Sequence, residues 1–143
     1  MSKYTSGPFT PKNPTKYVGK GTPHFRSSWE LAVFRFCDLN PAVISWASEF
    51  VSVPYRNPLT KKISHYVPDL FMMYVDKNGK KHVEVIEIKP LAETVIEMAK
   101  GARGRATVAV NHAKWQACEI YCQKKGFKFR VITERDIFAG IKK

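Results

Sequence analysis

The sequence predicts an α/β domain in which a central mixed β-sheet is flanked by α-helices. Runs rich in valine, isoleucine and aromatic residues occur together with segments of helical periodicity, in the order helix, strands, helix, strand, helix. Two of the β-type runs are joined by a short glycine-containing turn at residues 76–80. Such a turn is typical of a hairpin, which we expect at the centre of the sheet.

The first helix is expected to begin at Ser27 and to end near Leu39, because the following Asn40-Pro41 cannot continue it. The remaining elements are expected as strands at 43–55 (in two pieces), 65–75 and 82–89, a weakly helical segment at 91–100, a flexible basic joint at 101–105, a helix at 107–124, a strand at 127–133 and a last helix at 134–141.

The first 23 residues differ from the rest of the 143-residue chain, because proline, glycine and lysine are frequent there and apolar periodicity is weak. We expect residues 1–23 to form a basic extended arm and residues 24–143 to form a single domain. Tyr4, Phe9 and Tyr17 lie in this arm. We expect them to hold the arm against the domain; the alternative is stacking on nucleic-acid bases.

The chain is strongly basic, with 24 Lys and Arg against 12 Asp and Glu and a formal net charge of +12. Nucleic acid is the expected partner, because binding of phosphate to a basic surface releases counterions. No apolar stretch approaches ~20 residues, and neither a secretory signal nor a basic amphipathic helix is visible. We therefore expect a cytoplasmic protein without a membrane partner. The candidate phosphate contacts are Arg26, Arg103, Arg105 and Lys114.

The cysteines, Cys37, Cys118 and Cys122, form no C-x-x-C pair. We expect them to be buried free thiols. A zinc site using His112, Cys118 and Cys122 would still need a fourth ligand, and its spacing fits no common zinc pattern. We therefore set this alternative aside.

Charged residues stand inside the two central β-type runs. Asp69 lies in one of them, and Glu87 and Lys89 lie near the end of the other. Side chains two apart in a strand share a face, so Glu87 and Lys89 project together, roughly 6.5–7 Å apart along the backbone. Ile86 and Ile88 then point the other way, into the core.

The length of the turn decides whether Asp69 joins this face. A two-residue loop at 78–79 would set Asp69 opposite Ile88, on the wrong face. A three-residue loop at 77–79, with glycine in its third and left-handed position, would set Asp69 directly across from Glu87. Cross-strand neighbours have Cβ atoms about 4.5–5.5 Å apart, close enough for two carboxylates to hold one divalent ion.

Two carboxylates this close repel each other unless a cation lies between them. Mg²⁺ fits, with Mn²⁺ as a substitute, because it takes carboxylate oxygens, water and substrate phosphate. Lys89 would then bind the scissile phosphate, orient the attacking water or act as the base. The alternative is a strand entry at Asp69 and a solvated ion pair between Glu87 and Lys89, but acids within apolar strands on a basic chain favour the metal site.

Three segments in this order resemble the PD-(D/E)xK nuclease superfamily, and more narrowly its transposase endonuclease-subunit branch. They are RSSWE at 26–30, PD at 68–69 and EIK at 87–89. The resemblance implies a restriction-endonuclease-like fold, with one or two metal ions held by Glu30, Asp69 and Glu87 and with Lys89 beside them. That branch often has Gln at the position of Glu87, where a full acid strengthens metal binding.

Glu30 has a second possible role. Ser27 and Glu30 form an S-x-x-E capping box, in which Glu30 would accept a hydrogen bond from the Ser27 amide. Capping and metal binding compete for the same carboxylate. Glu30 is therefore the least secure of the four candidate catalytic residues.

Nearly the whole chain also resembles the head-completion proteins of T-even-type tailed phages, in segments such as FTPKNP at 9–14 and NHAKW at 111–115. These proteins are implied to act late in head assembly, after DNA packaging. The resemblance suggests trimming of packaged DNA ends, with portal or head-neck proteins as partners, in the host cytoplasm or on the virion.

The sequence therefore predicts a metal-dependent DNA endonuclease that hydrolyses phosphodiester bonds. One alternative is a non-catalytic, DNA-binding head-completion protein that keeps a nuclease fold. A basic RNA-binding domain is the third reading, which exposed aromatic residues would favour. The buried-looking aromatic pattern of this chain does not favour it.

Overall fold

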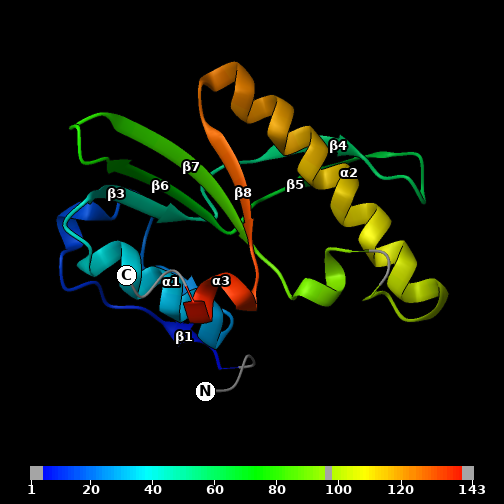
Figure 1. Cartoon of the computed structure of the whole chain (residues 1–143), viewed down its shortest axis with the longest axis horizontal. Helices are drawn as coiled ribbons and strands as arrows, with labels where there is room; N and C mark the ends of the chain where they lie inside the picture. Colours follow the sequence, from blue (N-terminus) through cyan, green and yellow to red (C-terminus); the bar gives the residue numbers. More distant parts are fainter. Residues whose placement is uncertain (1–4, 96–97, 140–143) are drawn as a thin grey trace.

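A computed structural model describes residues 5–95 and 98–139. Its central sheet has four strands in the order β3-β6-β7-β8 (Figure 1). They are β3 (Val43–Ser48), β6 (Leu70–Val75), β7 (Lys81–Ile88) and β8 (Lys128–Ile132). Neighbouring strands are antiparallel except β7 and β8, which are parallel. The predicted mixed sheet flanked by helices is confirmed.

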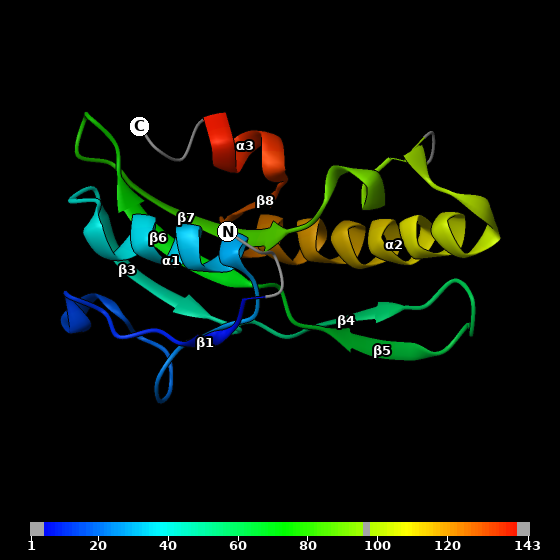
Figure 2. The same ribbon diagram turned by 90° about the horizontal axis from the view of Figure 1, so that it is seen from below.

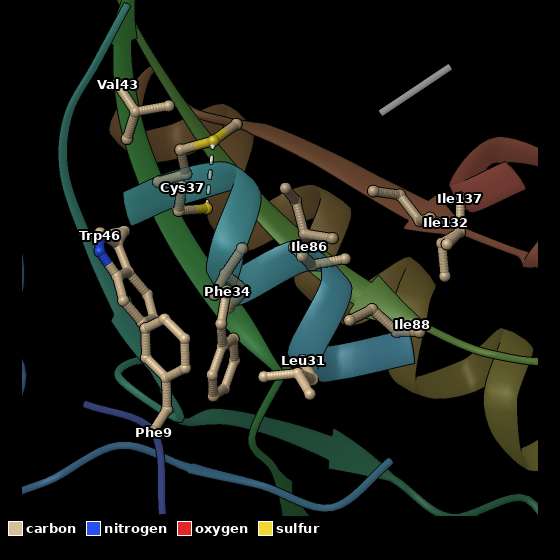
Figure 3. Close-up of a cluster of buried hydrophobic side chains, with 13 residues drawn as sticks. Phe9, Leu31, Phe34, Cys37, Val43, Trp46, Ile86, Ile88, Ile132 and Ile137 are labelled. Atoms are coloured by element: carbon tan, nitrogen blue, oxygen red, sulfur yellow. Dashed lines mark hydrogen bonds between the residues drawn. The ribbon is translucent and has the colours of Figure 1, made fainter. Parts of the chain in front are cut away.

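The helices lie on both faces of this sheet. They are α1 (Ser28–Leu39), α2 (Gly101–Lys125) and α3 (Glu134–Ala139). Ile86 and Ile88 of β7 pack in a cluster with α1 and with Ile137 of α3 (Figure 3), whereas Val85 packs in a second cluster with α2. From Glu84 to Ile88, strand β7 is therefore buried on both faces.

The N-terminal residues of the described part pack against the domain. Short strands β1 (Gly7–Pro8) and β2 (His24–Phe25) pair with each other, with the 3₁₀ turn η1 (Pro14–Lys16) between them. The rings of Phe9 and Tyr17 lie 5.8 and 4.7 Å from that of the buried Trp46. The expected attachment of these two aromatic residues is confirmed, while Tyr4 lies outside the described residues.

The predicted strand at 65–75 is divided in the structure. Strand β5 (Ile63–Tyr66) pairs with β4 (Val53–Arg56) in a separate two-stranded sheet, and β6 begins only at Leu70. The connection at 67–69 contains the buried Pro68, which has no backbone N–H to offer a sheet. This break separates the β4–β5 hairpin from the central sheet.

The predicted flexible joint at 101–105 is wrong, because α2 begins at Gly101. Gly101 has a φ of +68°, but Gly104 lies within the helix. Alanine and arginine around Gly104 are good helix formers, and Val108 anchors the first turns in the core. A helical segment is expected at 91–100. Among its described residues before Met98, only the 3₁₀ turn η2 (Leu91–Glu93) is helical.

The remaining elements lie close to their predicted positions. Gly126 ends α2 with a φ of +77°, in the left-handed conformation that favours glycine after a helix. Strand β8 and helix α3 follow, and the described part of the chain ends at residue 139. The last two residues of the predicted helix at 134–141 lie outside it.

Candidate active site

The turn between β6 and β7 has the three-residue form. The Asp76 amide donates a hydrogen bond to the Lys80 carbonyl (2.9 Å), and Gly79 has a φ of +79°. The pairing runs from Val75 with Lys81 to Leu70 with Ile86. Extended by one residue on each strand, this register sets Asp69 across from Glu87, as the site requires.

Asp69 is held in place from two sides. Its Oδ2 accepts a hydrogen bond from the Ile88 amide at 2.7 Å, and its carbonyl accepts one from the Glu49 amide at 3.1 Å. These bonds tie the connection after β5 both to β7 and to the end of β3. The carboxylate of Asp69 is therefore positioned by backbone groups of the central sheet.

Glu87 is almost completely buried, with 5% of its surface exposed. Its Oε2 lies 3.6 Å from Nζ of Lys89, so the predicted common face of these two residues is confirmed. Its Oε1 is buried without a hydrogen-bond partner among the described residues. A buried carboxylate oxygen without a partner is costly, unless a ligand completes its coordination.

The electrostatics of the pair favour a bound cation. Burial and the neighbouring Asp69 together raise the pKa of Glu87 to about 7, against the opposing effect of Lys89. Burial also raises the pKa of Asp69, against the effect of the Ile88 amide. Two carboxyl groups that resist ionising together become fully ionised when a divalent ion lies between them.

Glu30 lies in the first turn of α1. The Glu30 amide donates to Oγ of Ser27 (3.1 Å), as expected for an N-cap, but Oε1 of Glu30 accepts from the Arg26 amide (3.2 Å). The predicted bond to the Ser27 amide is therefore replaced by a bond one residue earlier. Burial and the charge of Asp69 together raise the pKa of Glu30 to about 7, which places Glu30 within electrostatic reach of Asp69.

Sequence reasoning missed Glu49, which follows β3. Its carboxylate forms an ion pair with Arg26 (2.8 Å), and its charge raises the pKa of both Asp69 and Glu30. Glu49 has a φ of +50°, which is uncommon for a residue with a side chain. The sequence 43–55 reads as two plain strand pieces, so nothing in it indicated that an acid would turn toward Asp69.

Sequence reasoning also missed Tyr66, at the end of β5. Tyr66 is buried, and its hydroxyl has no hydrogen-bond partner among the described residues. Burial and the charge of Glu87 both raise the pKa of this hydroxyl. An aromatic residue three positions before Asp69 looked like ordinary strand packing in the sequence.

The four predicted phosphate contacts occupy different settings. Arg103 and Arg105 are exposed in the first turns of α2, whereas Arg26 is paired with Glu49. Nζ of Lys114 lies 5.9 and 5.8 Å from the ring centroids of Tyr55 and Tyr66. These two rings hold a cation beside the face that carries Glu87.

The residues of the discounted zinc site are engaged elsewhere. Cys118 and Cys122 are buried in the cluster under α2, and His112 is hydrogen-bonded to the Thr94 carbonyl at 2.8 Å. Cys37 is buried in the cluster on the other face, where its Sγ lies 3.7 Å from Sδ of Met72 (Figure 3). All cysteines of the chain are thus buried free thiols, as expected.

The donor set at Asp69 and Glu87 fits a hard divalent ion. Both groups are carboxylates, the ligand type that Mg²⁺ and Mn²⁺ take, and Oε1 of Glu87 lacks any other partner in the described structure. Over residues 5–95 and 98–139, no group of three or more His, Cys, Asp or Glu side chains is gathered closely enough to form a metal site on its own. Water and substrate phosphate would complete the coordination of Mg²⁺.

An acidic pair with a lysine at the start of β6 and the end of β7, the two inner strands of a mixed sheet, indicates a nuclease-like protein. Comparison with known proteins agrees. Residues 40–134 match the family model described as the TnsA-like endonuclease N-terminal domain. The chain is also 36% identical over 142 residues to the protein named "Head completion nuclease" of Enterobacteria phage T4, covering 90% of this chain and 91% of that relative.

The chain belongs to the TnsA-like endonuclease family. The predicted resemblance to the transposase endonuclease branch and to phage head-completion proteins is confirmed. In the described part of the chain, no helix combines the length and apolar character that crossing a membrane would require.

Proposed function

We propose that this protein is a Mg²⁺-dependent endodeoxyribonuclease whose reaction is carried by Asp69, Glu87 and Lys89. The observation that carries the proposal is the β6–β7 register, which brings Asp69 across from Glu87, with Lys89 on the same face. The partnerless Oε1 of Glu87 and the raised pKa values of both acids support a cation at this place.

When bound, the divalent ion supplies charge stabilisation at the phosphate and lowers the pKa of a water molecule. Asp69, fixed by the Ile88 amide, and Glu87, fixed by its strand, would hold the ion between their carboxylates. Lys89 is 29% exposed at its side chain, so its ammonium group can reach a phosphate oxygen or the attacking water. Mn²⁺, with the same ligand preference, is expected to replace Mg²⁺.

Glu30 is proposed as the third carboxylate of the site. Its raised pKa shows that its charge is unfavourable in the metal-free protein, and Asp69 contributes to this. A cation near Asp69 would remove that repulsion. Its bond to the Arg26 amide uses one oxygen, which leaves the second oxygen for the ion or for a metal-bound water.

DNA is the proposed substrate, because the chain carries a net charge of +12 and belongs to an endonuclease family. Arg103 and Arg105, exposed in α2, are proposed to contact phosphates. Arg26 and Lys114 lie closer to the acidic residues and are proposed to hold the backbone near the cleaved bond.

The biological setting is proposed from the name of the phage T4 relative. A head completion nuclease related over 90% of the chain suggests that this protein also acts in phage head completion, on packaged DNA. Portal or head-neck proteins would then be its partners, and the host cytoplasm or the virion its location.

Cleavage of supercoiled plasmid DNA tests the proposal. The parent protein should nick or linearise the plasmid with Mg²⁺ or Mn²⁺ and stop when EDTA is added. Asp69→Asn, Glu87→Gln and Lys89→Met should each lower the rate by about 10²-fold or more, as for other groups that stabilise transition-state charge. Glu119→Gln, an exposed acid on α2, is the matched control and should cut like the parent.

The competing function is DNA binding without cleavage, which the basic surface would support by itself. It predicts salt-sensitive binding, no metal-dependent cutting by the parent protein, and no difference between the acidic-site variants and Glu119→Gln. Folded variants that cut as fast as the parent would exclude the proposed active site.

A further inference from the structure

The β4–β5 hairpin projects from the domain as a small sheet of its own. In Figure 2 it extends away from the central sheet toward the end of the molecule where α2 begins. Its base is firmly held, because Val53, Tyr55 and Tyr66 are buried in the cluster with Cys118 of α2. The hairpin therefore projects from the domain on a base that is packed against α2.

The hairpin tip, residues 56–63, is both basic and apolar on its surface. Its charged residues, Arg56, Lys61 and Lys62, are all exposed, and the segment contains no acid. Leu59 and Ile63 are also exposed, to 59% and 60%. Isolated exposed aliphatic residues are common, but two of them among three cations on a projecting tip suggest a partner with an anionic backbone and apolar surfaces between the charges.

The conformation of this tip is defined by its own hydrogen bonds. The side chain of Asn57 accepts a hydrogen bond from the Leu59 amide at 2.8 Å, and the Asn57 amide donates to the Lys62 carbonyl at 2.9 Å. Lys61 takes a left-handed conformation, with a φ of +63°. The cations and aliphatic side chains are therefore presented on an ordered turn.

The tip lies within reach of DNA bound at the active site. Asp69 lies eight positions after Lys61, so their Cα atoms are at most about 26–29 Å apart, the length of a fully extended chain. At about 3.4 Å per base-pair step, this is roughly one helical turn of a duplex or less. A two-stranded β-ribbon fits a DNA groove, where apolar side chains contact base edges and sugars.

We propose that the hairpin tip binds the duplex within one helical turn of the cleaved bond. Arg56, Lys61 and Lys62 contact phosphates, while Leu59 and Ile63 lie against the groove. This inference rests on the proposed function for the identity of the ligand. The β4–β5 hairpin, which carries no catalytic group, would thus bind the duplex beside the cleaved bond.

The second hairpin of the molecule offers a matched control. The β6–β7 turn also exposes lysines, Lys77 and Lys80, and it lies at the opposite end of the molecule (Figures 1 and 2). The double variants K61A/K62A and K77A/K80A therefore remove the same charge from two exposed turns. Both are expected to keep the parent melting temperature.

Binding is measured by fluorescence anisotropy on a 24-base-pair duplex in EDTA, at several salt concentrations. K61A/K62A should weaken binding about tenfold or more and reduce the salt slope by about two, as expected for two lost phosphate contacts. K77A/K80A should change both quantities much less. Equal weakening by the two pairs would overturn the inference, because net charge alone would then explain it.

Because no metal is present, this experiment is independent of cleavage. Failure of the proposed active site would appear as the absence of metal-dependent cutting by the parent, while the difference between the two hairpins remained. Failure of the hairpin inference would leave plasmid cleavage and its loss in Asp69→Asn unchanged. A further variant, Leu59→Ser, should weaken duplex binding without changing the salt slope, because it removes no charge.

A separate observation concerns the two partnerless polar atoms beside the active site. The hydroxyl of Tyr66 and Oε1 of Glu87 are both buried, and neither has a hydrogen-bond partner among the described residues. Tyr66 packs in the same cluster as Val85, which lies two residues before Glu87 on the same face of β7, so the two groups are neighbours. One is a donor and the other an acceptor, so a small rearrangement would satisfy both.

The Tyr66 ring is well fixed for such a role. It is 4% exposed and packs in the cluster with Val85 and Cys118. Nζ of Lys114 lies 5.8 Å from the centroid of this ring, and 5.9 Å from that of Tyr55. The position of the hydroxyl is therefore set by the packing of the ring.

We infer that Tyr66 is a positioning residue, which donates a hydrogen bond to one lone pair of Oε1 of Glu87 and leaves the other lone pair for the cation. This inference rests on the proposed function. This bond would fix the rotation of the carboxylate, with Oε2 on the side of Lys89. Tyr66→Phe removes the hydroxyl and keeps the ring. Tyr55→Phe is the matched control, because Tyr55 is a buried neighbour that makes the same contact with Lys114.

Calorimetric titration with Mn²⁺ in the absence of DNA distinguishes positioning from packing. Tyr66→Phe should lower the Mn²⁺ affinity about tenfold, as for other groups that orient a metal ligand, and keep the parent melting temperature. Tyr55→Phe should leave the affinity unchanged. An unchanged affinity in Tyr66→Phe, or equal losses in both variants, would overturn the inference.

Discussion

The carboxyl groups of Glu87, Asp69 and Glu30 all have raised pKa values, so their ionised forms destabilise the metal-free protein. Burial and the charge of Asp69 together raise the pKa of Glu87 and of Glu30 to about 7. Folding therefore favours the neutral form of each acid relative to the unfolded chain, while metal binding requires the ionised form. This conflict is typical of active sites, where selection for chemistry opposes stability.

The metal-free protein should lose stability as the pH rises from about 4.5 to about 7. In this interval the folded protein binds more protons than the unfolded chain, because the pKa values of Glu30 and Glu87 rise from 4.5 to about 7 on folding. Glu87→Gln should remove the part of this stability loss that comes from ionising Glu87. The metal-free variant should therefore be more stable than the parent at pH 8, by on the order of 1–3 kcal/mol.

Thermal melts in EDTA at pH 5 and pH 8 measure this effect. The melting temperatures of the parent and of Glu87→Gln are compared at each pH, so the contribution of the basic surface, which both proteins share, cancels. Mg²⁺ should raise the melting temperature of the parent at pH 8 and have little effect at pH 5. A Glu87→Gln variant that is less stable than the parent at pH 8 in EDTA would show that the ionised carboxylate is not under strain.

Glu30→Gln separates the two roles of that residue. The amide oxygen of glutamine still accepts a hydrogen bond from the Arg26 amide, so the melting temperature should stay within a few degrees of the parent value. Plasmid cleavage should fall about 10²-fold if the charge of Glu30 serves the metal site. Parent-like cleavage would leave Glu30 with capping as its role.

At the scale of elements, the β6–β7 hairpin could be predicted and the beginning of α2 could not. A turn with glycine in the third position of a three-residue loop leads to one register, and this register places Asp69 across from Glu87. The start of α2 depends on tertiary packing of Val108, which overrides the flexibility that two glycines suggest. The position of Glu49 similarly depends on a left-handed turn that no local signal marks.

Gly79 tests the role of the turn. Its φ is +79° and no atom lies within 4 Å of the place where a Cβ would stand, so substitution there strains the backbone alone. Gly79→Ala should lower the free energy of unfolding by about 1–2 kcal/mol, and Gly79→Asn by less, because asparagine tolerates this conformation. Urea unfolding measures both. Equal losses, or none, would contradict the assigned turn.

Viewed as a whole molecule, the protein has an apolar cluster on each of the two faces of one sheet. The face toward α1 and α3 holds the larger apolar cluster, which includes Trp46, Ile86 and Ile132 (Figure 3). Glu87 and Lys89 lie on the other face, where the β4–β5 hairpin and α2 meet. Strand β7 connects the two, because successive residues serve the core and the site.

The central claim is that Asp69 and Glu87 together hold a divalent ion. A crystal of the protein grown with Mn²⁺, with data collected at the manganese absorption edge, tests this most directly. The account predicts an anomalous peak within about 2–2.5 Å of oxygens from both carboxylates, a peak that is absent in Asp69→Asn. A protein that cleaves DNA with Mn²⁺ bound elsewhere, and with none between these two residues, would contradict it.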